Sequence, residues 1–90
     1  MKFSEKVTLQ NKLGLHLRAA AELVKVANKF KSQITAGRGM QNVNAKSLLG
    51  LMTLAASKGT ELEFTAEGED AKEALAALRH LIEQNFKEKQ

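Results

Sequence analysis

The spacing of apolar residues changes along the chain, and each change marks a different element. Phe3, Val7 and Leu9 share one parity while polar residues take the other, which predicts a first strand with one buried face. From Leu17 onward the apolar side chains recur every three or four positions, as they do on one face of a helix. This first helix is expected to end near residues 31–32.

A hairpin is predicted in the next part of the chain. Ile34 and Ala36 begin a second strand, and Val43 and Ala45 belong to the strand that returns beside it. The two glycines of residues 37–39 tolerate positive φ, so this segment is predicted to be the turn of the hairpin.

Ser47 stands directly before an apolar run with helical spacing. Serine is a good N-cap because its side-chain oxygen accepts a hydrogen bond from a free backbone N–H group. We therefore expect a short helix over residues 48–54. Leu48, Leu51 and Leu54 are expected to face the core from this helix.

The last third of the chain predicts one more strand and one more helix. Residues 61–67 alternate between apolar and polar side chains. Glu69 and Asp70 then place carboxylates at the positive end of a helix, and Lys87 and Lys89 lie near its negative end. The buried stripe of this helix is expected to contain Ala71, Ala74, Leu75, Leu78, Ile82 and Phe86.

The order of these elements predicts the fold class. It is strand, helix, strand, strand, helix, strand, helix, and every strand has only one apolar face. Such strands form an antiparallel sheet with its helices on one side. We expect a single domain over residues 1–90, an α+β open-faced two-layer sandwich with a four-stranded antiparallel sheet and three helices on one face.

Charge and composition narrow the function classes. The chain has a net charge of +4, with 14 basic and 10 acidic residues, two histidines and no cysteine. Interleaved charges are typical of a solvated surface, and a basic surplus also suits an acidic protein partner or a nucleic acid. Without cysteine there is no disulfide framework, and two histidines do not indicate a metal site.

Membrane insertion and secretion are not indicated by the sequence. No apolar stretch has the length that a membrane span requires. The N-terminal residues 1–6 contain no apolar run of the kind found in signal peptides. We therefore expect a cytoplasmic protein.

The segment with the most chemical information contains His16, which lies between a glycine turn and the first helix. The N–H groups at a helix start have no intrahelical partner and carry partial positive charge, so they bind phosphate well. Arg18 adds donors that suit phosphate oxygens. An imidazole is a nucleophile at neutral pH and can take up a phosphoryl group. The same spacing also suits an ordinary surface histidine.

Four segments together resemble the phosphocarrier protein HPr family of the bacterial phosphotransferase system. Residues 14–18 read Gly-Leu-His-Leu-Arg and are similar to the active-site signature of that family. Residues 45–51, 58–60 and 66–71 are similar to its later segments, in the same order and at the same spacing. The resemblance covers residues 3–86.

This resemblance implies a carrier of phosphoryl groups that is a protein substrate of other enzymes and needs no cofactor. It implies that His16 accepts the group from enzyme I and donates it to enzyme IIA domains in sugar uptake or regulation. It also implies that Arg18 steadies the group and that Ser47 is phosphorylated by an HPr serine kinase/phosphorylase. The pattern of residues by itself favours a simple N-cap role for Ser47, and the two roles are compatible. We expect a monomer that binds no nucleic acid.

Ala19 departs from the family, which usually has proline after the arginine. Proline in the first turn pre-sets φ and lacks an N–H group that would have no partner there. Alanine adds one N–H group at the phosphate end and has high helix propensity, so the helix is expected to persist.

A docking surface is expected beside His16. Outward-facing apolar residues rimmed by cations, Arg18 among them, suit an acidic partner with an apolar centre. The expected partner-binding residues are Leu17, Ala21, Lys25, Lys46, Leu49 and Met52. Leu49 and Met52 would alternatively be additional core residues.

The sequence is also compatible with two other functions. One is a regulatory paralogue, of a nitrogen-related branch or with impaired transfer, which Ala19 favours. The other is a small basic nucleic-acid-binding domain that uses the open face of the sheet. Such domains need aromatic rings on that face, whereas Phe3 and Phe64 are expected to point inward. His80 is expected to be a solvated surface residue on the last helix.

Overall fold

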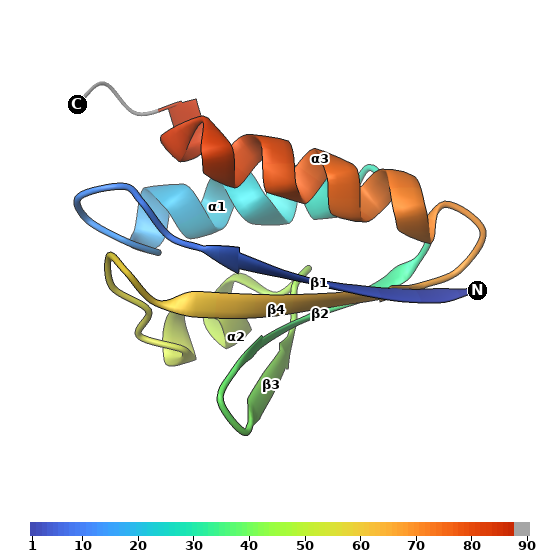
Figure 1. The fold of residues 1–90 in the computed structure, drawn as a ribbon, viewed down its shortest axis with the longest axis horizontal. Coiled ribbons are helices and arrows are strands. Elements are labelled where there is room, and N and C mark those ends of the chain that lie inside the picture. The colour runs from blue at the N-terminus through green and yellow to red at the C-terminus, as the bar shows by residue number, and fades with distance from the viewer. Residues whose placement is uncertain (88–90) are drawn as a thin grey trace.

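The computed structural model describes residues 1–87, so Lys89 lies outside the described part of the chain. The eight elements follow one another along a single layered unit (Figure 1). They are β1 (Lys2–Thr8), α1 (Leu17–Ala27), β2 (Gln33–Arg38), β3 (Gln41–Asn44), α2 (Leu48–Thr53), β4 (Glu61–Glu67), α3 (Ala71–Glu83) and a short 3₁₀ helix η1 (Asn85–Lys87).

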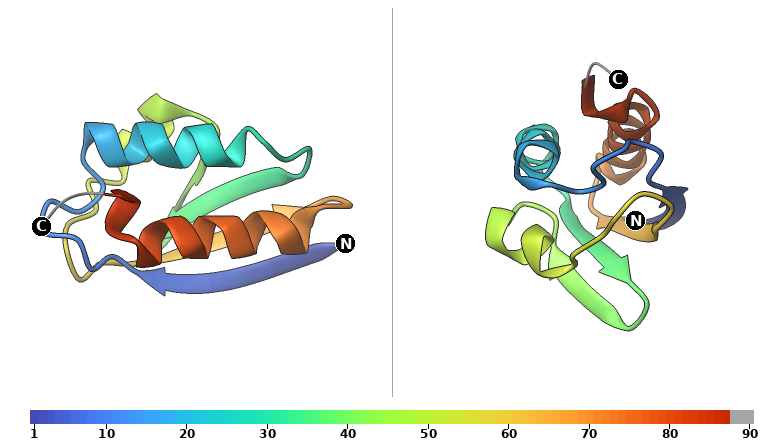
Figure 2. Two further views of the ribbon diagram at one scale, coloured as in Figure 1. Left: turned by 90° about the horizontal axis from the view of Figure 1, so that it is seen from above. Right: turned by 90° about the vertical axis from the view of Figure 1, so that its left-hand side faces the viewer.

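The four strands form one antiparallel sheet in the order β1-β4-β2-β3. Its register places Val7 opposite Leu62 and Ala36 opposite Phe64, so the apolar residues of neighbouring strands share one face. Helices α1 and α3 lie side by side over this face (Figures 1 and 2), and α2 packs against α1 and β3. The predicted open-faced α+β sandwich is confirmed.

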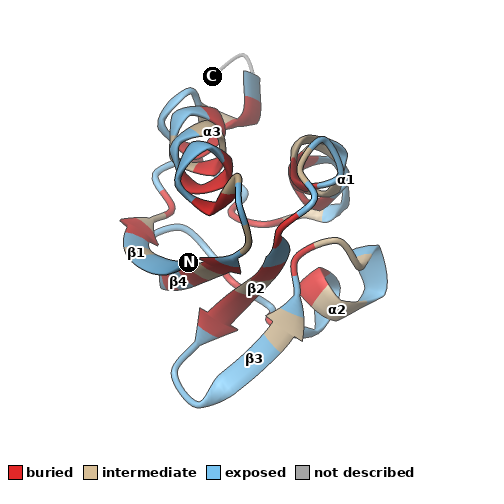
Figure 3. Cartoon of the chain, turned by 90° about the vertical axis from the view of Figure 1, so that its right-hand side faces the viewer, coloured by how far each residue is buried: buried red, intermediate tan, exposed pale blue. Residues whose placement is uncertain are grey.

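The core fills the space between the helices and the sheet. Leu23 of α1, Phe64 of β4 and Leu78 of α3 are almost completely buried. Burial of a side chain of this size contributes about 1.5–3 kcal/mol. Figure 3 shows the buried residues on the sides of α1 and α3 that face each other and the sheet. Every residue predicted for the stripe of α3 is buried, including Phe86, which η1 supplies after the helix has ended.

The first helix ends at Ala27, several residues before the predicted end. The N–H group of Phe30 bonds to the carbonyl of Ala27, three residues back, which tightens the last turn. The N–H groups of Lys31 and Ser32 donate instead to the carboxylate of Asp70, at 2.9 and 3.0 Å. A carboxylate distant in sequence therefore accepts the N–H groups that follow the helix end, and the periodicity of α1 does not contain that information.

The hairpin turn also differs from the prediction for residues 37–39. Strand β2 continues through Arg38, which pairs with Gln41, and the turn consists of Gly39 and Met40. Gly39 has the positive φ that such a turn requires, at 60°. Ala45 was predicted to lie in the returning strand, which ends one residue earlier.

Two residues predicted to face the core are partly exposed. Phe3 keeps 36% of its surface exposed because it lies near the end of the edge strand β1. Leu48 is 37% exposed, whereas Leu51 and Leu54 are buried as predicted. Helix α2 makes its main contacts with α1 and β3, so only a narrow side of it meets the core.

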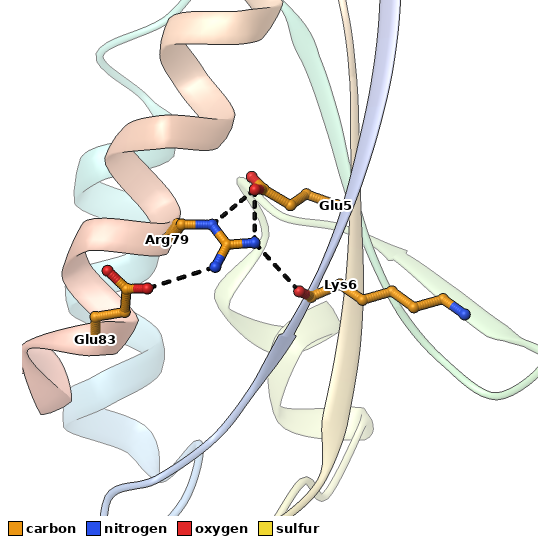
Figure 4. Close-up of polar contacts among 4 residues, drawn as sticks. All are labelled: Glu5, Lys6, Arg79 and Glu83. Atoms are coloured by element: carbon orange, nitrogen blue, oxygen red, sulfur yellow. Dashed lines mark hydrogen bonds and ion pairs between the residues drawn. The ribbon is translucent and has the colours of Figure 1, made fainter.

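An ion-pair network joins the edge strand β1 to α3 (Figure 4). The guanidinium of Arg79 donates to the Glu5 carboxylate through Nε at 2.7 Å and Nη2 at 2.6 Å. It also contacts Glu83 at 3.4 Å and the carbonyl oxygen of Lys6 at 3.5 Å. The hydrogen bond with Glu5 raises the pKa of Arg79. This network holds the helix layer against the sheet on the side away from α2.

Candidate functional site

The loop between β1 and α1 is attached to the segment that follows α2. The N–H group of Leu15 donates to the carbonyl of Ala56 at 2.8 Å, and that of Gly59 donates to the carbonyl of Leu9, also at 2.8 Å. Both bonds join parts of the chain that are more than 40 positions apart. His16, directly after this loop, is therefore positioned by two separate segments.

Gly14 makes this attachment sterically feasible. Its φ is 64°, and a Cβ atom built there would lie 2.5 Å from the carbonyl oxygen of Ala56. The buried Asn11 closes the turn, because its side-chain amide donates to the Gly14 carbonyl at 2.7 Å. A residue with a side chain at position 14 would separate the loop from its support.

His16 is the N-cap of α1 and is partly buried. Its backbone is extended, with φ −73° and ψ 176°, and its carbonyl accepts the first intrahelical bond, from Ala20 at 2.8 Å. The imidazole makes no capping bond to the helix. The N–H groups of residues 17–19 precede that first bond, and the first turn contains no acidic side chain. This end of α1 therefore keeps the partial positive charge that attracts an anion.

Arg18 is exposed, and its guanidinium makes no hydrogen bond or ion pair with another side chain of residues 1–87. Its donors are therefore available to an incoming group at the same helix end as His16. The next residue, Ala19, occupies the third position of α1 and is fully buried.

Ser47 is the N-cap of α2, as predicted. Its Oγ accepts a hydrogen bond from the N–H group of Gly50 at 3.0 Å. Lys46, expected on the rim of the docking surface, is partly buried, and its ammonium donates to the carbonyl of Phe30 at 2.7 Å. This bond ties the segment before α2 to the loop that follows α1.

The expected apolar docking residues are exposed on two helices that pack against each other. Leu17 at the start of α1 is 60% exposed, and Leu49 and Met52 on α2 are 81% and 37% exposed. Leu49 and Met52 are therefore not additional core residues. Ala21 and Lys25 are exposed on α1, where Lys25 pairs with Glu22 at 3.4 Å.

The partly exposed Leu48 adds to these apolar side chains and was missed as a surface residue. Helical spacing relative to Leu51 placed it in the core. The burial of Asn11 was not predicted either. An asparagine three residues before a glycine is typical of a turn closed by the asparagine side chain, and this spacing was visible in the sequence.

Other kinds of site are not found in the described residues. No group of three or more histidine and acidic side chains in residues 1–87 could hold a metal ion. In the same range no helix combines the length and apolar character needed to cross a membrane. His80 is exposed on α3, as predicted.

Comparison with known proteins identifies similar sequences along most of the chain. Residues 3–84 match the family model described as "PTS HPr component phosphorylation site". The chain is 48% identical to the phosphocarrier protein HPr of Xylella fastidiosa (strain Temecula1) over 82 residues, which cover 91% of this chain and 92% of that protein. It is also 48% identical to the HPr of Pseudomonas aeruginosa over 83 residues, with the same coverage.

The fold has equally close counterparts among solved structures. The crystal structure of HPr-C-His from Thermoanaerobacter tengcongensis superposes with a TM-score of 0.94 at 43% sequence identity. The match covers 98% of this chain and 99% of that one.

Proposed function

Because the chain belongs to the HPr family, the phosphocarrier proteins of the phosphotransferase system, we propose that His16 is its phosphoryl acceptor. Proteins of this family carry the phosphoryl group and are not catalysts in their own right. In this proposal His16 accepts the group from enzyme I and passes it to enzyme IIA domains. The position of the imidazole at the anion-attracting start of α1 supports the assignment.

The transfer needs only a few groups from this chain. A neutral imidazole nitrogen attacks the phosphorus carried by enzyme I. A nitrogen–phosphorus bond forms, the bond from phosphorus to the donor atom breaks, and its electron pair returns to the donor. The N–H groups of residues 17–19 and the guanidinium of Arg18 stabilise the negative oxygens during the exchange. Transfer to an enzyme IIA domain is the same step in reverse.

Partner docking is proposed on the apolar surface beside His16. Leu17, Leu49 and Met52 supply its exposed centre, and the cations of α1 form its edge. An acidic partner with apolar residues would complement this surface. Ala21 and Lys46 border it in the same proposal, with Lys46 acting through its bond to the loop that follows α1.

Ser47 is proposed as a second, regulatory phosphorylation site for an HPr serine kinase/phosphorylase. A phosphate at this helix start would be tolerated by α2 but would add about two negative charges next to the docking surface. Those charges would repel an acidic partner.

Nucleic-acid binding on the open face of the sheet is not part of the proposal. Phe64 is buried and Phe3 borders α3, so neither supplies a stacking ring on that face. Three exposed glutamates along β4 would repel phosphates: Glu61, Glu63 and Glu67.

We further expect the chain to be a single domain that is monomeric in solution. Sedimentation velocity measures the oligomeric state.

Mass spectrometry tests the central proposal. The protein is incubated with enzyme I and phosphoenolpyruvate, and a gain of about 80 Da that is labile in acid is expected. H16A should lose the adduct, whereas the matched control H80A should keep it. An adduct that persists in H16A would contradict the assignment of His16.

A further inference from the structure

A shallow cleft of about 320 Å³ lies between α1 and α3, outside the docking surface described above. All of its lining residues come from the helix layer, and the sheet contributes none. The two helices run side by side over the sheet (Figure 2), so this cleft opens between them toward solvent. None of its residues has a role in phosphoryl transfer.

The floor of the cleft is apolar. Val26 on α1 and Phe30 just after that helix contribute two side chains one turn apart, and both are partly buried against the core. Ala77 and Leu81 on α3 contribute a second pair with the same spacing. Ala77 and Leu81 lie one above the other because they are four residues apart on one helix. They form one wall of a groove, and Val26 and Phe30 form the other.

The rim of the cleft is basic. Lys29, His80 and Lys87 line it and are exposed, and no acidic residue among residues 1–87 lines it. Within residues 1–87 none of the three takes part in an ion pair, whereas Arg79 on the same helix is held by two carboxylates. The cleft therefore combines an apolar floor with positive charge that no carboxylate of the described chain neutralises.

We propose that this cleft binds a small organic anion with one acidic head group and an apolar body, of the size of a medium-chain carboxylate. The head group would pair with Lys29 and His80, which come from opposite walls, and the apolar body would cover Val26 and Leu81. The volume lies at the lower end of the range of small-molecule pockets. A stable protein interface needs on the order of 1,000 Å² of buried area, which favours a small ligand over a docked helix.

An NMR titration tests the proposal with octanoate as the probe. Amide signals of the ¹⁵N-labelled protein are followed while octanoate, octylammonium or 1-octanol is added. Octanoate is expected to cause saturable shifts at residues 26–30 and 77–84. Octylammonium and 1-octanol should bind at least about fivefold more weakly, because they lack the negative head group.

Two variants separate the charge from the cleft. K29Q/H80Q removes the basic side chains from both walls and should weaken octanoate binding about fivefold. A77L keeps every charge and a good helix former while it fills the floor, and should also weaken binding. K58Q, which removes an exposed cation outside the cleft, is the matched control and should bind like the original protein. All three should keep the His16 adduct.

Several outcomes would overturn the proposal. Equal binding of octanoate and octylammonium would indicate only a nonspecific apolar surface. Octanoate shifts confined to Leu17, Leu49 and Met52 would place the ligand on the docking surface. Cosedimentation with phosphatidylglycerol vesicles but no binding of free octanoate would identify a membrane surface as the source of the anion. Binding of an acidic amphipathic peptide but not of octanoate would indicate a protein partner.

Discussion

At the scale of single residues, Gly14 shows how a close approach of two backbones restricts one position. Gly14 and Gly39 both have φ near 60°. A Cβ atom at Gly14 would collide with the backbone of Ala56, whereas a Cβ atom at Gly39 would meet no other atom within 4 Å. The sequence alone does not show which of these two glycines lies against another part of the chain. Only the packing of the loop against Ala56 distinguishes them.

A pair of alanine substitutions measures that difference. G39A should lose about 1–2 kcal/mol of unfolding free energy, the cost of an L-residue in a left-handed conformation. G14A should lose more, because the added methyl group also displaces the segment after α2, and it should transfer phosphoryl groups more slowly. Urea denaturation and the rate of His16 phosphorylation provide the two measurements. Equal losses in both variants would contradict the role given to the close approach.

Ala19 stands where the resemblance to the HPr family leads us to expect a proline. Its N–H group precedes the first intrahelical bond, so a proline there removes no bond of α1. Its side chain is completely buried, so the larger ring has to be accommodated within the core. We expect A19P to fold and to transfer phosphoryl groups at a changed rate. An unchanged rate, measured with enzyme I and phosphoenolpyruvate, would show that the departure is silent and would remove its support for a regulatory paralogue.

At the scale of elements, α2 combines a cap and a proposed regulatory site in Ser47. The two roles can be separated because aspartate caps helices about as well as serine, whereas alanine does not. S47D should keep its stability and lose transfer from enzyme I. S47A should lose about 1 kcal/mol of stability and keep transfer. Thermal unfolding and transfer rates measure both effects, and undiminished transfer in S47D would remove the regulatory proposal.

The same helix exposes Leu49, the most exposed residue of the docking surface. L49D should change the unfolding free energy by less than about 0.5 kcal/mol, since the side chain contributes little to the core. It should weaken enzyme I binding about tenfold, as expected when the apolar centre of an interface receives a charge. M40D, at the fully exposed turn of the hairpin, is the control and should bind normally. Titration calorimetry compares the two variants, and equal affinities would exclude the α2 surface.

At the scale of the whole molecule, Asp70 joins the start of α3 to the loop between α1 and β2. Its hydrogen bond from the Ser32 hydroxyl, together with the backbone N–H groups of Lys31 and Ser32, lowers the pKa of this carboxyl. The resulting stability is present above the ordinary value of 3.8 and is lost as the pH falls through the lower value of the folded state.

A comparison of D70N with the original protein measures this contribution. D70N should be less stable at pH 7. The difference should begin to shrink as the pH falls below the ordinary value of 3.8, and it should vanish only below the lower pKa of the folded state, where the original carboxyl is also neutral. E69Q, which changes an exposed neighbouring carboxylate, should not show this pattern. Urea midpoints between pH 3 and pH 7 check the prediction. A difference independent of pH would show that the loop is held by packing and not by the charged carboxylate.

The sequence by itself determined the elements whose signal is local. The two-residue period of β4, the buried stripe of α3 and the cap at Ser47 follow from neighbouring residues, so the fold class could be predicted. The candidate role of His16 came from its place between a glycine and a helix start. Its identification as an acceptor came from the resemblance of several segments in fixed order.

Only the tertiary structure decided the features that join distant parts of the chain. Asp70 holds the loop after α1 across 39 positions, Arg79 holds β1 across 74, and Lys46 bonds to Phe30 in the loop after α1. The exposure of Leu48 and the cleft between α1 and α3 likewise depend on which helix sides meet. Periodicity identifies the apolar side of an element, but hydrogen bonds and packing between elements depend on their positions in space.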